Sequence, residues 1–315
     1  MRNNKKLILI LPCYNEEENI EYASSHLTEK LNSLINENLI SDDSKICFVN
    51  DGSNDNSLDK LNQLADENKR IAFINLTRNY GHQYAMYAGM KTVDADMIIT
   101  LDADLQDDIN AIDEMIKCYH EGYEIVYGCR NKRTTDTFFK RTTAIAFYHI
   151  IKFLCPRIYH NHADYRLMSR KALQMLGEYN EKQLFLRGLI PHLGLKSTTV
   201  LYDRKPRTAG ETKYNYSSMF NLAWIGITNH SVLPLRLISL TGIFLILITL
   251  FSFFVSLIAG MKTGSYSSVL LIIQSMCLLS GLIILSIGIV AEYVAKILYE
   301  VKDRPVFQIE STKNL

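Results

Sequence analysis

Short apolar runs alternate with longer amphipathic segments in the N-terminal part of the chain. The runs predict strands at Lys6–Pro12, Lys45–Asp51, Ala72–Leu76, Met97–Asp102 and Glu124–Gly128. The segments with helical spacing and length are 16–38, 56–70, 82–92 and 109–121. Continuous apolar strands separated by helices are typical of a mostly parallel sheet that is covered on both faces. The pattern therefore predicts an α/β domain, to which we assign residues 1–230.

Two long stretches without charge follow this domain. One lies between Arg236 and Lys262, and the other lies between Lys262 and Glu292. Each exceeds the roughly 20 residues that a helix needs to cross a hydrocarbon core. We therefore expect a two-helix transmembrane hairpin over 231–298 and a tail over 299–315. Basic residues flank the hairpin on its outer sides, which predicts a multi-pass protein of the inner membrane with its α/β domain and both termini in the cytoplasm.

Charge is divided unevenly along the chain, although its net value is only +1. Residues 1–129 carry a net charge of −12 and residues 130–213 a net charge of +11. The basic stretch predicts contact with phosphates or anionic headgroups and, alternatively, is a solvated face. Two aromatic segments, about 136–155 and 214–233, fit interfacial helices as well as ordinary core helices. Their proximity to the charge-free stretches favours the membrane interface.

The cysteines and the N-terminus indicate in which cellular compartment the protein resides. Six cysteines occur without any CxxC pair, which indicates free thiols in a reducing compartment. No small-residue cleavage site follows the short apolar run near the N-terminus, so no signal peptide is expected.

Polar motifs stand directly after three of the predicted strands. They are Tyr14-Asn15-Glu16, Asp51-Gly52-Ser53 and Asp102-Ala103-Asp104. Ligands of such sheets bind beyond the carboxyl ends of the strands. On an extended chain the carboxylates of Asp102 and Asp104 project to the same side, and hard oxygen ligands suit Mg²⁺ or Mn²⁺. A solvated strand end is the alternative reading of this pair alone.

The combination of motifs resembles the family 2 glycosyltransferases with the GT-A nucleotide-sugar fold, in the branch that acts on polyisoprenyl phosphates. This branch includes dolichol-phosphate mannose synthases and bacterial undecaprenyl-phosphate glucosyltransferases. Besides the three motifs above, the matching segments are Arg78–Gly81, Asp102–Asp107, Gly128–Arg130, Asp164–Arg170, Arg207–Tyr214 and Asp303–Pro305. One departure is Asn50, which stands where the family often has a further Asp before Asp51.

The resemblance implies an enzyme of the cell envelope that transfers a sugar to undecaprenyl phosphate. UDP-glucose is the first expectation for the donor, with UDP-N-acetylglucosamine, UDP-galactose and GDP-mannose as alternatives. It further implies a metal-dependent, inverting reaction with Mg²⁺ or Mn²⁺ as cofactor. No nucleic-acid partner is expected, and a homo-oligomer is left open.

Site residues are expected in three groups. For catalysis and acceptor binding, the residues are Asp104, Asp164, Arg130, Lys140, Arg141 and Arg166. For donor binding, they are Pro12, Tyr14, Asn15, Glu16, Asp51, Ser53, Arg78, Asp102, Ala103, Gln106, Arg207 and Lys213. The metal ligands are Asp102 and Asp104. Whether Asp164 acts as a base or positions the acceptor stays open at this point.

Three other functions are weighed against this one. A processive polysaccharide synthase would carry a Gln-x-x-Arg-Trp motif, which the surroundings of the only tryptophan, Trp224, lack. A dinucleotide-dependent oxidoreductase would carry GxGxxG after the first strand, and none is present. A catalytically inert membrane scaffold is the third alternative, and the intact Asp102, Asp104, Arg207 and Lys213 argue against it.

Overall fold

The computed structural model describes residues 5–130, 162–179, 181, 184–203 and 301–315, together with isolated helical positions between 272 and 298. The chain divides into two compact units, Met1–Leu222 with Pro305–Leu315, and Ala223–Arg304. The first unit holds every strand of the described chain.

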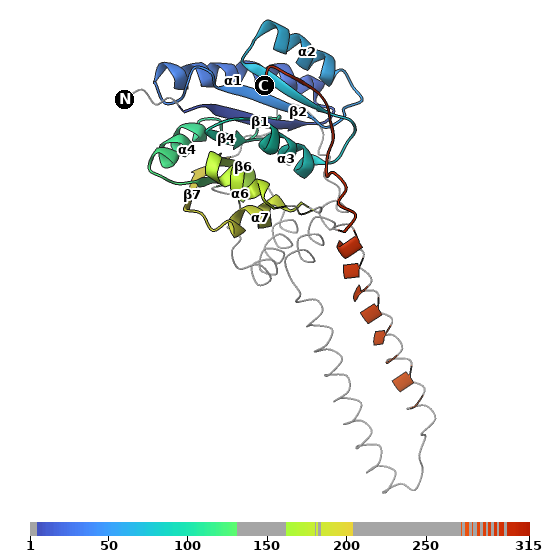
Figure 1. Ribbon diagram of the computed structural model, residues 1–315. Coiled ribbons are helices and arrows are strands. Elements are labelled where there is room, and N and C mark those ends of the chain that lie inside the picture. Colours follow the sequence, from blue (N-terminus) through green and yellow to red (C-terminus); the bar gives the residue numbers. More distant parts are fainter. Residues whose placement is uncertain are drawn as a thin grey trace, which may run out of the picture. The chain divides into compact units, whose positions relative to one another are not determined.

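An eight-stranded sheet forms the centre of the first unit (Figure 1). Its strands are β1 (Leu7–Cys13), β2 (Lys45–Asn50), β3 (Ile71–Leu76), β4 (Met97–Thr100), β5 (Ile125–Arg130), β6 (His162–Ser169), β7 (Ser197–Tyr202) and β8 (Ile309–Lys313). They lie in the order β7-β5-β6-β4-β1-β2-β3-β8. The helices are α1 (Glu17–Asn36), α2 (Ser57–Glu67), α3 (His82–Thr92), α4 (Ala111–His120), α6 (Arg170–Gly177) and α7 (Leu186–His192). The five predicted strands and four predicted helices are thus confirmed.

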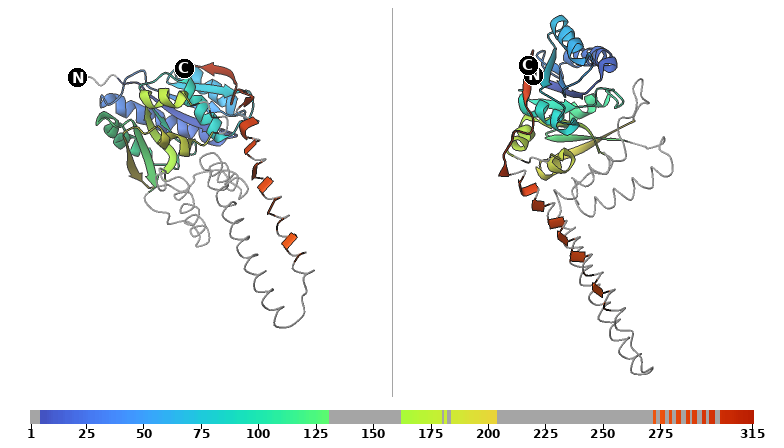
Figure 2. Two further views of the ribbon diagram at one scale, coloured as in Figure 1. Left: turned by 60° about the horizontal axis from the view of Figure 1, so that its bottom comes forward. Right: turned by 90° about the vertical axis from the view of Figure 1, so that its right-hand side faces the viewer.

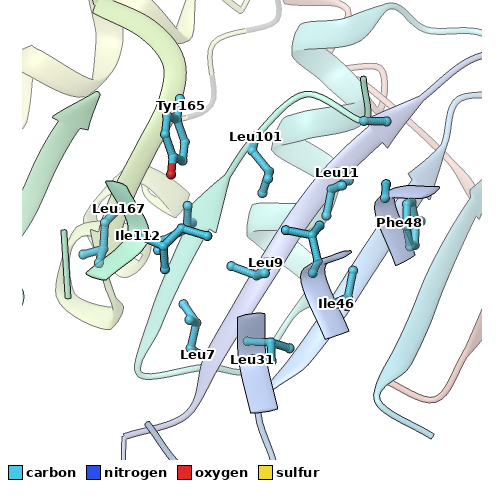
Figure 3. Close-up of a cluster of buried hydrophobic side chains, with 14 of the residues drawn as sticks. Leu7, Leu9, Leu11, Leu31, Ile46, Phe48, Leu101, Ile112, Tyr165 and Leu167 are labelled. Atoms are coloured by element: carbon cyan, nitrogen blue, oxygen red, sulfur yellow. The ribbon is translucent and has the colours of Figure 1, made fainter. Parts of the chain in front are cut away.

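Two hydrophobic cores cover the two faces of the sheet, and β1 contributes to both. Leu7, Leu9 and Leu11 pack with α1, α2 and α4 in one core, which Figure 3 shows in close-up. Ile8 and Ile10 point to the opposite core, where α3, α6 and α7 pack. Side chains alternate between the two faces of a strand, so a strand buried on both faces is apolar at every position. This is why the sequence of β1 shows no polar alternation.

The direction of the strands brings many chain segments to one edge of the sheet. Strand β4 runs parallel to β1, and β1 parallel to β2. Strand β6 runs antiparallel to both of its neighbours, β4 and β5. The carboxyl ends of β1, β2, β4 and β5 therefore share an edge with the amino end of β6, and we call this the active edge.

The last strand comes from the far end of the chain. Strand β8 pairs antiparallel with β3, with Asn75 opposite Ser311, and it appears as the red arrow at the edge of the sheet in Figure 2. Part of the segment expected as a tail, 299–315, is therefore an edge strand of the sheet.

The expected transmembrane hairpin requires correction. Within the part of the chain that the structure describes, no helix has both the length and the apolar character needed to cross a bilayer. This finding contradicts the two-helix hairpin over 231–298 and the multi-pass location in the inner membrane. Lack of charge sets only how apolar a segment is, whereas a span also requires about 20 residues in one continuous helix. Residues 231–271 of that segment, and the expected interfacial helices at 136–155 and 214–233, lie outside the described residues.

Candidate active site

The carboxylates of Asp102 and Asp104 lie just past the end of β4, on the active edge. The Asp104 carboxylate accepts a hydrogen bond from the backbone N–H of Gln106 (3.2 Å), which closes a tight turn. The Asp102 side chain keeps 35% of its surface exposed. Its pKa is raised by desolvation and by the nearby carboxylates of Asp107, Asp164 and Asp104, while His82 opposes the shift. A carboxylate in such crowded acidic surroundings is a good ligand for a cation.

Asp164 is the centre of a second cluster at this edge. Its backbone carbonyl, at the start of β6, accepts a hydrogen bond from the Thr100 hydroxyl at the end of β4. Its side chain is 7% exposed and accepts hydrogen bonds from Nη2 of Arg166 (2.5 Å) and from Nε and Nη2 of Arg187 (3.1 and 2.8 Å). Burial raises the pKa of Asp164, but Arg187 and Arg166 outweigh burial and hold it far below its usual range. Asp164 is therefore fixed as an anion.

Arg166, expected among the catalytic residues, has a completely buried side chain. Its Nε also donates to the carbonyl oxygen of Asp164 (3.4 Å), and burial lowers its pKa. Its Nη1 has no hydrogen-bond partner among the described residues. The Arg166 side chain therefore contacts Asp164 from the interior of the domain.

The start of α3 joins the two acidic groups. Nε2 of His82 lies 3.6 Å from Oδ1 of Asp102 and 3.7 Å from Oδ2 of Asp164. The side chain of Gln83 donates to Asp164 (3.4 Å) and accepts from the backbone N–H of Leu186 at the start of α7 (3.2 Å). The first turn of α3 thus connects the end of β4 with α7.

The loops after β1 and β2 are held together by side-chain hydrogen bonds. The hydroxyl of Ser53 accepts from the backbone N–H of Asn15 (2.9 Å), and the side chain of Asn15 accepts from the backbone N–H of Asn54 (2.8 Å). The backbone N–H of Glu16 donates to the hydroxyl of Ser57 (3.1 Å). These contacts bring together three of the residues expected to bind the donor.

Asp51 is occupied by the backbone of the loop after β3. Its two carboxylate oxygens accept from the backbone N–H groups of Tyr80 and Gly81, each at 2.8 Å. The residue is 3% exposed, and this burial raises its pKa although the two N–H groups oppose the shift. Arg78, from the same loop, stacks its guanidinium over the ring of Tyr80 at 4.2 Å. Asp51 therefore shapes the loop that carries Arg78.

A third cluster surrounds Arg130 at the end of β5. Its guanidinium donates to the hydroxyl of Tyr202 (3.3 Å) and lies 3.5 Å from the carboxylate of Asp107. The Tyr202 hydroxyl donates to the same carboxylate (2.7 Å). Asp107 thus fixes the position of Arg130, whose side chain keeps 24% of its surface exposed.

Of the remaining expected site residues, some lie in the described part of the chain and the others lie outside it. Pro12 and Ala103 are buried, Pro12 within β1 and Ala103 in the core. Both side chains are apolar, so these residues offer a ligand only their backbone groups. The hydroxyl of Tyr14 accepts from the side chain of Asn54 at 3.4 Å. Lys140, Arg141, Arg207 and Lys213 lie outside the described residues.

The oxygen ligands on the active edge fit a divalent cation that is shared with a substrate. Gln106 follows Asp104 by two positions, and its buried Oε1 has no hydrogen-bond partner among the described residues. No group of three or more His, Cys, Asp or Glu side chains suited to one ion occurs in the described ranges. Mg²⁺ is commonly held by one or two carboxylates together with substrate phosphates and water. Two carboxylates and one amide oxygen therefore suit this kind of site better than a closed protein cage.

Sequence reasoning missed His82, Gln83 and Arg187. His82 directly follows the matched segment Arg78–Gly81 and begins a predicted helix, which was a usable signal. Arg187 stands in an apolar segment, Leu184–Ile190, and only its charge among apolar neighbours marks it. The docking of α7 beside β6 gives Arg187 its place in the site.

Comparison with known proteins identifies the family of the chain. Residues 8–177 match the family described as glycosyl transferase family 2. The chain is 44% identical to the uncharacterized glycosyltransferase YkoT of Bacillus subtilis, over 96% of this chain and 91% of the relative. It is 34% identical to the bactoprenol glucosyl transferase of Shigella phage SfX, over 98% of this chain and 100% of the relative.

Among solved structures, one similar chain is the glucosyl-3-phosphoglycerate synthase of Mycobacterium tuberculosis in complex with Mn²⁺, UDP-glucose and phosphoglyceric acid. The likeness has a TM-score of 0.44 at 14% identity and covers 70% of this chain and 76% of that one. The full-length sequence matches and the matched family decide the assignment. The chain belongs to glycosyl transferase family 2 and is a glycosyltransferase.

Proposed function

We propose that this glycosyltransferase moves a hexose from a nucleotide diphosphate sugar to a polyisoprenyl phosphate, with inversion at the anomeric carbon. UDP-glucose is the first donor to test, and undecaprenyl phosphate the first acceptor. The structural observation that carries the proposal is the meeting of two acidic groups on the active edge, Asp102 and Asp164, on either side of His82. The relative named bactoprenol glucosyl transferase supports the choice of acceptor.

Asp102 and Asp104 would hold a divalent cation, with the Oε1 of Gln106 as a further oxygen. When bound, this cation would neutralise the charge that develops on the leaving nucleotide diphosphate. The raised pKa of Asp102 supports this assignment. Desolvation and the neighbouring carboxylates make its negative charge unfavourable, and a bound cation would offset this effect.

The loops after β1 and β2 would receive the nucleotide. Asn15 and Ser53 present polar groups there, in a geometry fixed by their mutual hydrogen bond. Asp51 contributes by holding the backbone at Tyr80 and Gly81, which sets the position of Arg78. In this proposal Arg78 serves the donor phosphates, since a guanidinium matches phosphate geometry.

Asp164 would act as a fixed anion that positions cations. A carboxylate whose pKa lies far below its usual range accepts a proton poorly and is a weak general base. The acceptor does not need one, because a phosphate monoester has a second pKa near 6 and is largely a dianion at neutral pH. Asp164 then serves by orienting Arg187 and His82, and Arg130 supplies positive charge for the acceptor phosphate.

A transfer assay tests the proposal. The full-length chain is incubated with undecaprenyl phosphate, Mg²⁺ or Mn²⁺, and radiolabelled UDP-glucose, UDP-N-acetylglucosamine, UDP-galactose or GDP-mannose in turn. Label from one donor should enter the lipid fraction, and NMR of the product should show a β-linked sugar phosphate from an α-linked donor. Absence of transfer from all four donors would favour an inert scaffold, and an α-linked product would refute inversion.

A further inference from the structure

A row of side-chain hydrogen bonds crosses the sheet from its C-terminal edge strand to the loops of the active edge. The carboxylate of Glu310, on β8, accepts from Nδ2 of Asn75 on β3 (2.8 Å). Oδ1 of Asn75 accepts from Nδ2 of Asn50 on β2 (2.8 Å). Oδ1 of Asn50 accepts from the hydroxyl of Ser53 (2.5 Å), and that hydroxyl accepts from the backbone N–H of Asn15 (2.9 Å). We call these five residues the amide row.

The amide row has a direction, and Glu310 sets it. A carboxylate only accepts hydrogen bonds, whereas a side-chain amide carries a donor at one end and an acceptor at the other. Glu310 therefore turns the donor end of Asn75 toward itself, and Asn75 in turn accepts from Asn50. Asn50 is left with its oxygen toward Ser53, where it also accepts from the Ser53 backbone N–H (3.3 Å).

The direction of these hydrogen bonds matters because the two asparagines in the middle of the amide row are buried. Asn75 is 4% exposed and Asn50 is 1% exposed, so water offers little replacement for a lost partner. Buried polar groups in folded proteins are almost always hydrogen-bonded. If Asn50 turned over, its NH₂ group would face the backbone N–H of Ser53, and two donors would oppose each other.

We propose that Glu310 is a positioning residue for the donor nucleotide, acting through Asn75 and Asn50 on Ser53 and Asn15. The inference rests on the proposed function, because it takes Ser53 and Asn15 as part of the nucleotide site. It assigns the C-terminal strand a role in donor affinity that is separate from its role in completing the sheet.

The two roles can be separated because β8 has other anchors. Nζ of Lys313 lies 2.8 Å from the carboxylate of Asp66. The side chain of Asn314 donates to the carbonyl oxygens of Ala65 (2.6 Å) and Ile71 (3.0 Å). Lys313→Gln is therefore a matched control: it removes a charge and an ion pair from the same strand and leaves the amide row intact.

Three variants test whether the direction of the hydrogen bonds in the amide row matters for donor binding. Glu310→Gln permits both directions of Asn75, so the backbone N–H of Ser53 alone still favours the present orientation of Asn50. Asn50→Asp places carboxylates on both sides of Asn75, whose amide oxygen must then face one of them. The double variant Asn50→Asp/Glu310→Gln restores a single direction. In it the new glutamine donates to Asn75, Asn75 donates to the new aspartate, and that aspartate accepts from Ser53. The double variant also keeps the total charge of the parent chain.

The experiment measures donor KM and kcat together with amide hydrogen exchange at Asn15 and Ser53, in the full-length chain. We expect Asn50→Asp to raise donor KM about tenfold and Glu310→Gln about threefold, as befits one hydrogen bond, with kcat changed less than about twofold. Both variants should exchange faster at Asn15 and Ser53. The double variant should return KM and exchange to near those of the parent, and Lys313→Gln should change neither.

Two results would overturn the inference: an unchanged donor KM in Asn50→Asp, or a double variant no better than Asn50→Asp alone. If the parent chain transfers no sugar from any donor, the proposed function fails, and hydrogen exchange alone then decides. In that case, the positioning role is refuted if the single variants leave the hydrogen-exchange rates at Asn15 and Ser53 unchanged. It is supported if the single variants raise these rates and the double variant restores them.

Discussion

Nη2 of Arg187 lies 2.8 Å from Oδ2 of Asp164, and Nε of the same guanidinium lies 3.1 Å from Oδ1. This two-point contact joins α7 to the start of β6, and Nη2 of Arg166 meets the same carboxylate from the interior. One anion is therefore shared by a fully buried cation and by one that is 32% exposed. We therefore expect the two arginines to contribute differently to stability and to transfer activity.

Replacing each arginine by methionine should separate stability from activity. Arg166→Met leaves Asp164 without its interior partner, and breaking a buried pair costs about 3–5 kcal/mol. Arg187→Met removes a partly exposed partner while Arg166 remains, so we expect a loss of about 1 kcal/mol in stability. Transfer activity should nevertheless fall in Arg187→Met, because Arg187 lies at the active edge.

Urea unfolding and the transfer assay measure these two effects. The free energy of unfolding should rank the parent first, Arg187→Met second and Arg166→Met last. Equal destabilisation by the two variants would contradict the shared-anion description, as would full activity in Arg187→Met.

Gly52 occupies a position that excludes any side chain. Its φ is +63°, and a Cβ atom there would lie 2.4 Å from the backbone carbon of Arg78. Gly52→Ala should therefore destabilise the chain by about 1–3 kcal/mol, the range for strained backbone positions, and should weaken donor binding. Gly81→Ala is the matched control, since its φ of +100° adds strain while no atom lies within 4 Å of the added Cβ.

Thermal unfolding and UDP binding measured on both variants test this reading. Loss of UDP affinity in Gly52→Ala that exceeds the loss in Gly81→Ala would point to the contact with Arg78. Equal losses would attribute the effect to backbone conformation alone.

The thiols of Cys13 and Cys47 should resist alkylation in the folded chain. Burial raises the pKa of both, that of Cys47 to about 12. The reactive thiolate is then nearly absent at pH 8. Because the folded pKa exceeds the unfolded one, the related stability is complete below about pH 8.5 and is lost as pH rises toward about 12.

Iodoacetamide labelling followed by peptide mass spectrometry checks this expectation. Cys13 and Cys47 should react at pH 8 only when urea unfolds the chain. Labelling of either thiol in the native chain, at a rate above that of global unfolding, would contradict the packing of β1 and β2.

The parallel half of the sheet could be predicted from the sequence because its signal is local. Each of the strands β1 to β5 is a mostly apolar run in the sequence. The motifs at Asn15, Asp51 and Asp102 come shortly after the ends of three of these strands. The expectation that these motifs meet at one edge needed only the rule for parallel sheets.

The remainder depends on pairings between distant segments. The insertion of antiparallel β6 between β4 and β5 places Asp164 near Asp102, and no local pattern encodes that order. Strand β8 is mostly exposed and polar, so it lacks the apolar signal of a strand, and its partner β3 lies in the first third of the chain. The contact of Arg187 with Asp164 likewise follows from the docking of α7.

Asn50 shows how structure changed the meaning of a residue noted in the sequence. In the sequence it stands out only as a departure from the family pattern, which often has an aspartate at this position. In the structure its side chain links Asn75 to Ser53, and an aspartate at this position would face Asn75 together with Glu310. The neighbours of position 50 therefore favour an amide.

Binding of UDP measured by calorimetry, with Mn²⁺ and with EDTA, tests the central assignment most directly. We compare the parent chain with Asp104→Asn and with Asp108→Asn, a matched change in the same acidic segment whose side chain contacts Asn110. We expect Mn²⁺-dependent binding in the parent and in Asp108→Asn. Affinity should fall about tenfold or more with EDTA, which removes the cation, and in Asp104→Asn, which removes one of its ligands. Unchanged Mn²⁺-dependent affinity in Asp104→Asn would contradict the assignment of Asp104 as a ligand of the cation.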